Sequence, residues 1–255
     1  MMGQTMEITT NATAVTYMEL TESGADADTY QIWYGEIGMG MSGMGQNQSF
    51  TSDTASLEMV DPMSKVLAGL SDKKFSAKIT RKGIVQEVMG LEEMVKKATE
   101  GMPGGPAASE QISGSFGDDG LAKNLETTTD IFPDGEVKEG DSWTKTQYTS
   151  TGLPLISTTT YTLKTMVDGV ATIEVSAVLE TDPENAQTSM QGLDATQFYE
   201  GTRTGTLTMD VTSGWVTAGN LKDDIVGSIT IAPGAQVPDG MTIPLEMIND
   251  ITISN

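Results

Sequence analysis

Residues 161–179 read YTLKTMVDGVATIEVSAVL, and this stretch decides the fold class. Asp168-Gly169 divides it into two runs, and an Asp-Gly step between two such runs is typical of a tight β-hairpin. In the second run every other residue is apolar: Ile173, Val175, Ala177 and Leu179. A period of two gives a strand one buried face and one exposed face, so the stretch predicts an antiparallel hairpin that covers a core.

The same alternation and the same kind of turn recur in both directions along the chain. Residues 75–80 and 206–211 alternate between apolar and polar side chains. Each run is followed by a glycine turn, Lys82-Gly83 after the first and Ser213-Gly214 after the second, and then by another strand-like run. Near the start, Glu22-Ser23-Gly24 separates two more runs. Consecutive hairpins of this kind form an antiparallel meander, so the sequence predicts a mainly β protein.

Helical signals are few and short. Asp61-Pro62 precedes the first, over 63–70, and Asp suits the N-cap while Pro suits the first helical position. Residues 91–99 place apolar side chains on one helix face, and residues 121–125 form a third, shorter segment. We therefore expect two or three short helices against the strands.

Residues 100–120 are rich in Gly, Pro and Ser, a composition typical of a connector. They divide the chain into two halves of similar plan, each with long strands and one strand–glycine turn–strand unit (75–89 and 206–218). We expect one domain over 1–255, with lobe one at about 1–99 and lobe two at about 121–255. The predicted fold class is mainly β (α+β): a strongly curved antiparallel sheet, or half-barrel, in two similar lobes.

The composition excludes several kinds of chemistry. The chain carries a net charge of −22, from 36 acidic and 14 basic residues, and it contains no Cys and no His. A field of that sign repels phosphate backbones and anionic lipid surfaces, so we expect no nucleic-acid partner. Such acidity either keeps an exported protein soluble or recruits a cationic partner. Without Cys and His the chain lacks disulfides, thiol nucleophiles, imidazole bases and the commonest metal ligands.

Motifs of catalysis are missing as well. The chain has no Gly-x-Ser-x-Gly elbow, no phosphate-binding Gly-x-x-x-x-Gly-Lys and no dinucleotide fingerprint, since Gly38-x-Gly40 lacks a strand–helix context. Two carboxylates of a glycosidase would leave no sequence signature, but few aromatic residues are present to hold a sugar. We expect the protein not to be an enzyme.

Methionine is unusually frequent, with 17 residues, and Met39, Met41 and Met44 cluster in a Gly/Ser-rich stretch that we interpret as a loop. Three interpretations stay open: packing or a loose turn, a lipid-facing lip, and a thioether site for Cu(I) or Ag(I). The acidic pairs Asp118-Asp119 and Asp223-Asp224, and the spaced Asp26-x-Asp28, do not fit a calcium-loop motif. We expect no metal and no cofactor, and these three methionines remain weak metal candidates.

Two stretches resemble known sequences. FPDGEVKEGDSW, at 132–143, and FSAKITRKGIV, at 75–85, with the Gly-Leu-Glu-Glu that follows at 90–93, resemble an uncharacterised family of bacterial exported lipoproteins. More remotely, two strand-rich lobes with short helices resemble the half-barrel lipoprotein carriers of the LolA and LppX type. Those proteins hold acyl chains between a curved sheet and a helical lid, so the resemblance implies lipid binding and carries over no catalytic residue.

The Gly140-Asp141-Ser142-Trp143 block also has a structural interpretation. Gly-Asp is turn chemistry, and Trp143 would then begin a strand and cover the edge of the core. Direct contact of Trp143 with a ligand is the alternative.

The segment pattern indicates an exported protein. No run reaches the ~18–20 consecutive apolar residues of a membrane span. Met1-Met2-Gly3-Gln4 leads directly into strand-like sequence, and we expect that a leader and an anchoring Cys were removed before this point. We therefore expect a periplasmic or outer-membrane-anchored protein of a bacterium, with membrane contact only through that removed lipid anchor.

The function expected from the sequence is a non-catalytic cell-envelope lipoprotein domain that binds or carries a lipid or other apolar small molecule. Only five Phe and three Trp are available to fill the interior. Since native interiors are close-packed, we expect an apolar cavity beneath the helices over 63–70 and 91–99. The alternative is a structural or adhesion module that presents a β surface, and a third possibility is Cu(I) binding by methionine.

Overall fold

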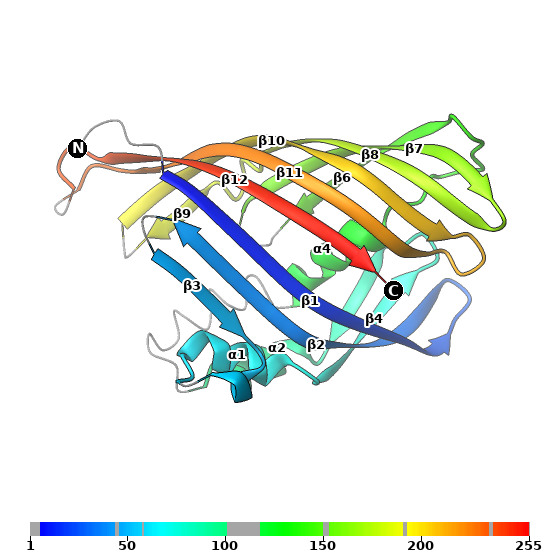
Figure 1. Cartoon of the computed structure of the whole chain (residues 1–255), viewed down its shortest axis with the longest axis horizontal. Coiled ribbons are helices and arrows are strands. Elements are labelled where there is room, and N and C mark those ends of the chain that lie inside the picture. The colour runs from blue at the N-terminus through cyan, green and yellow to red at the C-terminus, as the bar shows by residue number, and fades with distance from the viewer. Residues whose placement is uncertain are drawn as a thin grey trace.

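The protein, described as a computed structural model over residues 6–43, 46–57, 59–100, 118–149, 153–190, 193–234 and 237–254, is mainly β. Its strands form two antiparallel sheets accompanied by short helices (Figure 1). The first sheet contains β1 (Met6–Ser23), β2 (Ala27–Gly43), β3 (Gln46–Thr51), β4 (Lys74–Thr80) and β5 (Val85–Met89). The second contains β6 (Ser142–Thr149), β7 (Leu155–Val167), β8 (Val170–Thr181), β9 (Gln187–Met190), β10 (Leu193–Asp210), β11 (Trp215–Ile231) and β12 (Met241–Ser254).

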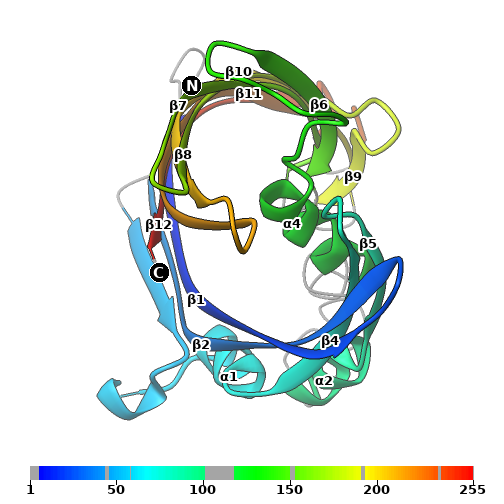
Figure 2. The ribbon, with the colours of Figure 1, turned by 90° about the vertical axis from the view of Figure 1, so that its right-hand side faces the viewer.

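The two sheets meet at β1 and β12. These strands pair in parallel at Met6–Leu245 and Glu7–Glu246, and then separate along their length (Figure 1). This short ladder links both sheets into the order β5-β4-β2-β1-β12-β11-β10-β8-β7-β6, with β3 beside β2 and β9 beside β10. The path ends at β5 and β6, which do not pair with each other within the described ranges. Helix α4 (Asp118–Thr129) lies between these two edge strands (Figure 2).

The hairpins expected from the sequence are confirmed. Strands β7 and β8 pair on either side of the Asp168-Gly169 turn. Both turn residues have positive φ, +51° for Asp168 and +78° for Gly169. Strands β4 and β5 pair around Gly83, and β10 and β11 pair around Gly214. In each case a glycine occupies the left-handed region that other residues adopt only at a cost.

Within the described ranges the helices are η1 (Thr54–Ser56), α1 (Pro62–Leu70), α2 (Leu91–Ala98) and α4. The cap predicted for α1 is confirmed, because the Asp61 side chain accepts a hydrogen bond from the Ser64 N–H at 2.9 Å. Helix α2 has Glu92 and Glu93 in its first turn and two lysines in its last turn, as the helix dipole favours. Helix α4 is longer than the predicted segment 121–125.

One core lies against the first sheet and includes residues of α1, α2 and α4. Its buried residues are Ile32, Ile37, Val66, Leu67, Leu70, Phe75, Ala77, Ile79, Val88, Leu91, Val95 and Leu125. The apolar faces of α1 and α2 are therefore in contact with the strands. We expected a pocket beneath these two helices; the space there is occupied by side chains of this core, and the pocket described below lies elsewhere.

Two further clusters lie on the second sheet. One contains Ile131, Tyr161, Leu163, Ala171, Ile173, Val175, Leu207 and Met209. The other contains Leu155, Ala177, Leu179, Tyr199, Ile225, Leu245 and Met247. The alternation of residues 171–179 thus buries one face of β8, as the sequence predicted.

The expected connector over 100–120 needs one correction. Residues 118–120 belong to α4, because the helix begins at Asp118. Residues 101–117 lie outside the described ranges. The division into two lobes stays a prediction.

Candidate functional site

A pocket of about 350 Å³ lies where the β4–β5 turn, the β10–β11 turn and the end of α4 meet. Its walls come from both sheets and from the segment after α4. The lining residues are Asp28, Tyr30, Ile79, Thr80, Arg81, Gly83, Thr128, Thr129, Phe132, Val211, Thr212, Ser213, Gly214 and Trp215. This volume lies within the ~300–1,000 Å³ range of small-molecule sites. We refer to it as the mouth pocket.

Three aromatic rings line the mouth pocket, and they come from segments far apart in the sequence. Tyr30 of β2 and Trp215 of β11 meet edge to face, with centroids 5.5 Å apart and planes at 86°. Phe132, which follows α4, packs beside Gly214, so that a Cβ added to Gly214 would lie 3.6 Å from the Phe132 Cζ. The two perpendicular rings and the third ring beside them make the site partly apolar and stiff.

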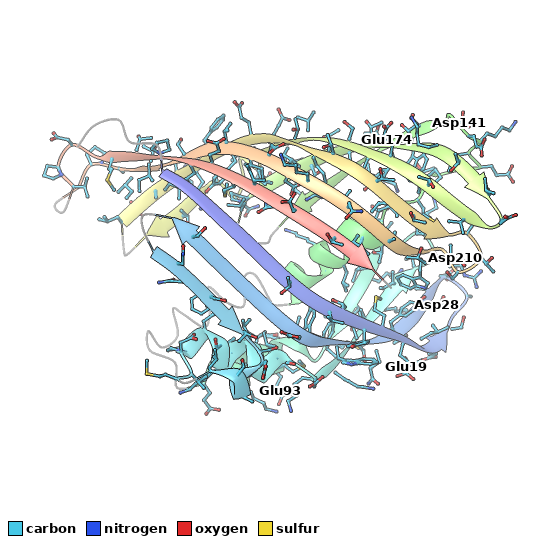
Figure 3. All side chains as sticks on the ribbon, viewed as in Figure 1. Glu19, Asp28, Glu93, Asp141, Glu174 and Asp210 are labelled. Carbon is cyan, nitrogen blue, oxygen red and sulfur yellow. The ribbon has the colours of Figure 1, made fainter. Side chains whose placement is uncertain are left out.

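The pocket also carries charge. The Asp28 Oδ1 accepts hydrogen bonds from the Ser23 hydroxyl at 2.8 Å and the Gly24 N–H at 3.1 Å. Burial, and then the negative charge of Asp28, raise the pKa of Tyr30 above its usual value. Arg81 contributes a cation at the exposed β4–β5 turn. Asp28 and Asp210 lie at the same end of the molecule (Figure 3).

Helix α4 holds the β4–β5 turn in place. The Thr129 hydroxyl donates to the Gly83 carbonyl at 2.5 Å, and the Val85 N–H donates to the Glu126 Oε1 at 3.0 Å. Burial is the largest influence on Glu126 and raises the pKa of its carboxyl above the usual value. This side of the pocket therefore depends on contacts made by the last turns of α4.

The same segment is joined to the edge strand of the second sheet. The Gln147 Nε2 donates to the carbonyls of Glu126 and Asp130, at 2.8 and 3.1 Å. Lys145 forms a half-buried ion pair with Asp130 at 2.7 Å. Residues 126–130 thus bridge the two edge strands that do not pair with each other, and they fix the position of the Phe132 that follows.

Trp143 has the anchoring role that its sequence context predicted. Strand β6 begins at Ser142, and the Trp143 Nε1 donates to the Ile131 carbonyl at 2.7 Å. Its ring stacks on that of Tyr161 with centroids 5.7 Å apart. Since Trp143 is not among the pocket-lining residues, its contacts are those of the core edge.

A row of residues crosses the second sheet between its two apolar clusters, and all of them are polar except Ala177, which belongs to the second cluster. The strand register aligns Lys145, Thr159, Ala177, Arg203, Asp223 and Asn249 across β6, β7, β8, β10, β11 and β12. Arg203 donates to both carboxylate oxygens of Asp223, at 2.6 and 2.9 Å, and the Asp223 side chain is only 5% exposed. A buried pair of this kind contributes little net stability but favours one register.

Within the described residues, the buried polar atoms of this row have hydrogen-bond partners. Among the described residues, every buried side-chain nitrogen and oxygen has a hydrogen-bond partner. Thr159, for example, exchanges a hydrogen bond with Ser157 at 2.9 Å. We therefore take the row as a structural feature of the sheet rather than as a binding site.

Of the three predicted metal candidates, the structure describes the side-chain surroundings of Met39 alone. Residues 38–43 are not a loop but the end of β2, paired with β3, so the loop interpretation is wrong there. Met39 faces the core of the first sheet, Met41 belongs to the same strand, and Met44 lies outside the described ranges. Met39 is therefore engaged in packing.

The acidic pair Asp223-Asp224 does not converge on one site. Asp223 points to Arg203, whereas Asp224 forms an exposed ion pair with Lys222 at 2.8 Å. Asp28 lies at the mouth pocket. In the part of the chain that the structure describes, no three Asp or Glu side chains are grouped as metal ligands would be.

Sequence reasoning missed Tyr30, Phe132 and Trp215. The one usable signal was the position of Trp215 directly after the Gly214 turn. Trp is rare in this chain, and a large ring beside a turn is placed to contact a neighbouring element.

The model of a family of unknown function (DUF6263) matches residues 27–216. The matched region includes every residue of the mouth pocket. No curated protein and no solved structure shows significant similarity to the chain. None of the helices in the described ranges is long and apolar enough to cross a membrane.

Proposed function

The chain belongs to the DUF6263 family, and we propose that it is a non-catalytic binding domain of the bacterial cell envelope. It holds a small lipophilic or amphiphilic molecule in the mouth pocket. The observation that carries this proposal is the pocket itself, in which rings from both sheets and from the segment after α4 line one volume of about 350 Å³.

The wider setting of the proposal is a two-lobed half-barrel, exported as a lipoprotein and anchored at the periplasmic or outer-membrane surface. The bent strand path in Figure 2 and the bridging position of α4 support such a shape. The resemblance to exported lipoproteins supports the location. Carriers of the LolA and LppX type offer a similar arrangement of sheet, helices and apolar ligand.

Absence of His and Cys from the sequence supports a role without catalysis, since no imidazole or thiol is available. Arg81 and Asp28 are the charged residues that line the pocket. The Asp28 Oδ1 already accepts two hydrogen bonds. This arrangement suits recognition better than proton transfer.

Native mass spectrometry of protein purified from its own host tests the proposal, together with titration of the neutral fluorescent probe N-phenyl-1-naphthylamine. Thr212→Trp places a ring at the pocket rim, and Thr202→Trp on the exposed face of β10 is the matched control. We expect a bound small molecule or probe in the parent and the control, and its loss in Thr212→Trp. If the parent binds neither, the proposal falls.

A structural or adhesion module is the second candidate. The fully hydrogen-bonded polar row and the packed core beneath α1 and α2 favour it, because both are features of an interior built for rigidity. Cu(I) binding is third and has less support, since Met39 packs against the first core.

A further inference from the structure

Three aromatic residues line the mouth pocket, and two of their rings form a right angle. Tyr30 and Trp215 stand perpendicular to each other, and Phe132 lies against the neighbouring Gly214. The faces of aromatic rings carry partial negative charge, so several rings around one volume attract a cation that has little water bound to it. Quaternary ammonium groups are cations of this type.

The charges around the rings favour the same sign of ligand. Asp28 lines the pocket, and its negative charge adds to the effect of burial in raising the pKa of Tyr30. Within the described residues, no hydrogen bond involves the second carboxylate oxygen of Asp28, Oδ2, which leaves this oxygen for a ligand. The net charge of −22 adds a long-range field that concentrates cations and repels anions.

The size of the site restricts the group further. A volume of about 350 Å³ is near the lower end of the range for ligand pockets. Thr80, Thr128 and Ser213 are among the lining residues, and their hydroxyls already bond to the Ile84 N–H, the Leu125 carbonyl and the Asp210 carboxylate. A polar arm of the ligand would have to share these hydroxyls.

We propose that the mouth pocket recognises a quaternary ammonium group, the cationic head of a small or lipid-like molecule. Tyr30, Trp215 and Phe132 contact the methyl groups, and Asp28 supplies the opposite charge. This inference rests on the proposed binding function and adds the chemistry of the ligand head. Arg81 opposes binding at the exposed rim and sets an upper limit on affinity.

Choline and 3,3-dimethyl-1-butanol provide the test, because the second replaces the charged nitrogen by carbon at nearly the same shape. Calorimetry and Trp fluorescence follow both titrations in the full chain. We expect choline to bind about tenfold more tightly than the neutral alcohol.

Three substitutions then locate the site. Tyr30→Leu removes a ring and should lower choline affinity about fivefold or more, whereas Tyr30→Phe keeps the ring and should change it less than about twofold. Phe198→Leu removes an exposed ring that does not line the pocket and should have no effect. Arg81→Gln should raise the affinity. Circular dichroism confirms the fold of each variant.

The outcomes separate the two proposals. Equal binding of choline and the neutral alcohol, both weakened by Tyr30→Leu, would overturn the ammonium inference and leave the binding function standing. If neither choline nor the neutral alcohol binds while N-phenyl-1-naphthylamine still does, the ammonium inference is likewise overturned and the binding function stands. Failure of all three compounds and of ligand detection by mass spectrometry would remove the binding function as well.

Discussion

Gly83, in the β4–β5 turn, and Gly214, in the β10–β11 turn, both have positive φ, +85° and +73°, and both border the mouth pocket. Their surroundings differ. A Cβ at Gly83 would collide with the carbonyl group of Thr129 in α4, whereas a Cβ at Gly214 would make an ordinary contact with Phe132 at 3.6 Å. Two turns that look alike in sequence thus differ in how well they tolerate a side chain at glycine, because the Gly83 turn packs directly against α4 and the Gly214 turn does not.

Substitution of Gly83 should have the largest effect of the changes considered. Gly83→Ala should lower the free energy of unfolding by about 3 kcal/mol, since a left-handed residue costs about 1–2 kcal/mol and overpacking adds about 1–3 kcal/mol. Urea denaturation measures this loss. Gly135→Ala, where a Cβ would meet nothing within 4 Å, is the control and should change little. A loss below about 1 kcal/mol for Gly83→Ala would show that α4 yields freely.

The hydrogen bond from α4 to the Gly83 carbonyl can be removed without changing a residue of the turn. Thr129→Val deletes the donor to the Gly83 carbonyl, which then stays buried and unpaired, and should cost about 2 kcal/mol. Thr128→Val is matched to it, because among the described residues the Thr128 hydroxyl bonds to the Leu125 carbonyl alone, and Thr128 is exposed. Thermal and urea unfolding of both variants should differ clearly. Equal stability would mean that the hydroxyl contact adds nothing to the first turn.

Gly214 should respond more mildly. Gly214→Ala introduces only the cost of a left-handed residue, about 1 kcal/mol, since the space beside it is open enough for a methyl group. Gly214→Asn should cost less still, because Asn tolerates this conformation. The comparison of the two turns would collapse if Gly214→Ala proved as destabilising as Gly83→Ala.

The smallest effect is expected for the pH dependence of stability. Glu126, beside the Gly83 turn, and Asp210, beside the Gly214 turn, should shift it in opposite directions. Burial raises the pKa of Glu126 above 4.5, so the stability linked to its protonation is complete below its unfolded-state pKa and is lost as pH rises through the folded value. Hydrogen bonds from the Ser213 and Thr212 N–H groups lower the pKa of Asp210 below 3.8. Its contribution is present above the unfolded-state pKa and is lost as pH falls through the lowered value.

Carbon-detected NMR of the carboxyl groups checks this order, with Glu126→Gln and Asp210→Asn to assign the signals. On acidification from pH 7, Glu126 should take up its proton first and Asp210 later. The reverse order would contradict the environments assigned to the two turns.

Local features of the fold were predictable from sequence. The hairpins at Asp168-Gly169, Gly83 and Gly214, and the Asp61 cap of α1, each depend on residues only a few positions apart. Trp143 was expected at a core edge because a Gly-Asp turn precedes it, and its contacts with Ile131 and Tyr161 agree.

Other expectations failed where a distant partner overrides local preference. Residues 38–43 are rich in Gly and Met and suggested a loop, but hydrogen bonds to β1 and β3 hold them in β2. The predicted helix at 121–125 was too short, because Glu126, beyond the predicted end, bonds to Val85 of β5 and Gln147 of β6 and holds the following turn of α4. Neither partner can be read from the segment itself.

The sequence alone therefore determined the strand and turn pattern, the short helices and the chemistry that the chain lacks, because each follows from residue type and near-neighbour spacing. Only the tertiary structure decided that Tyr30, Phe132 and Trp215 share one pocket and that α4 bridges β5 and β6. Tyr30 lies 102 positions before Phe132, and Phe132 lies 83 positions before Trp215, far beyond any periodic signal. The physical reason is that they meet only once the two sheets have paired at β1 and β12 and bent toward each other.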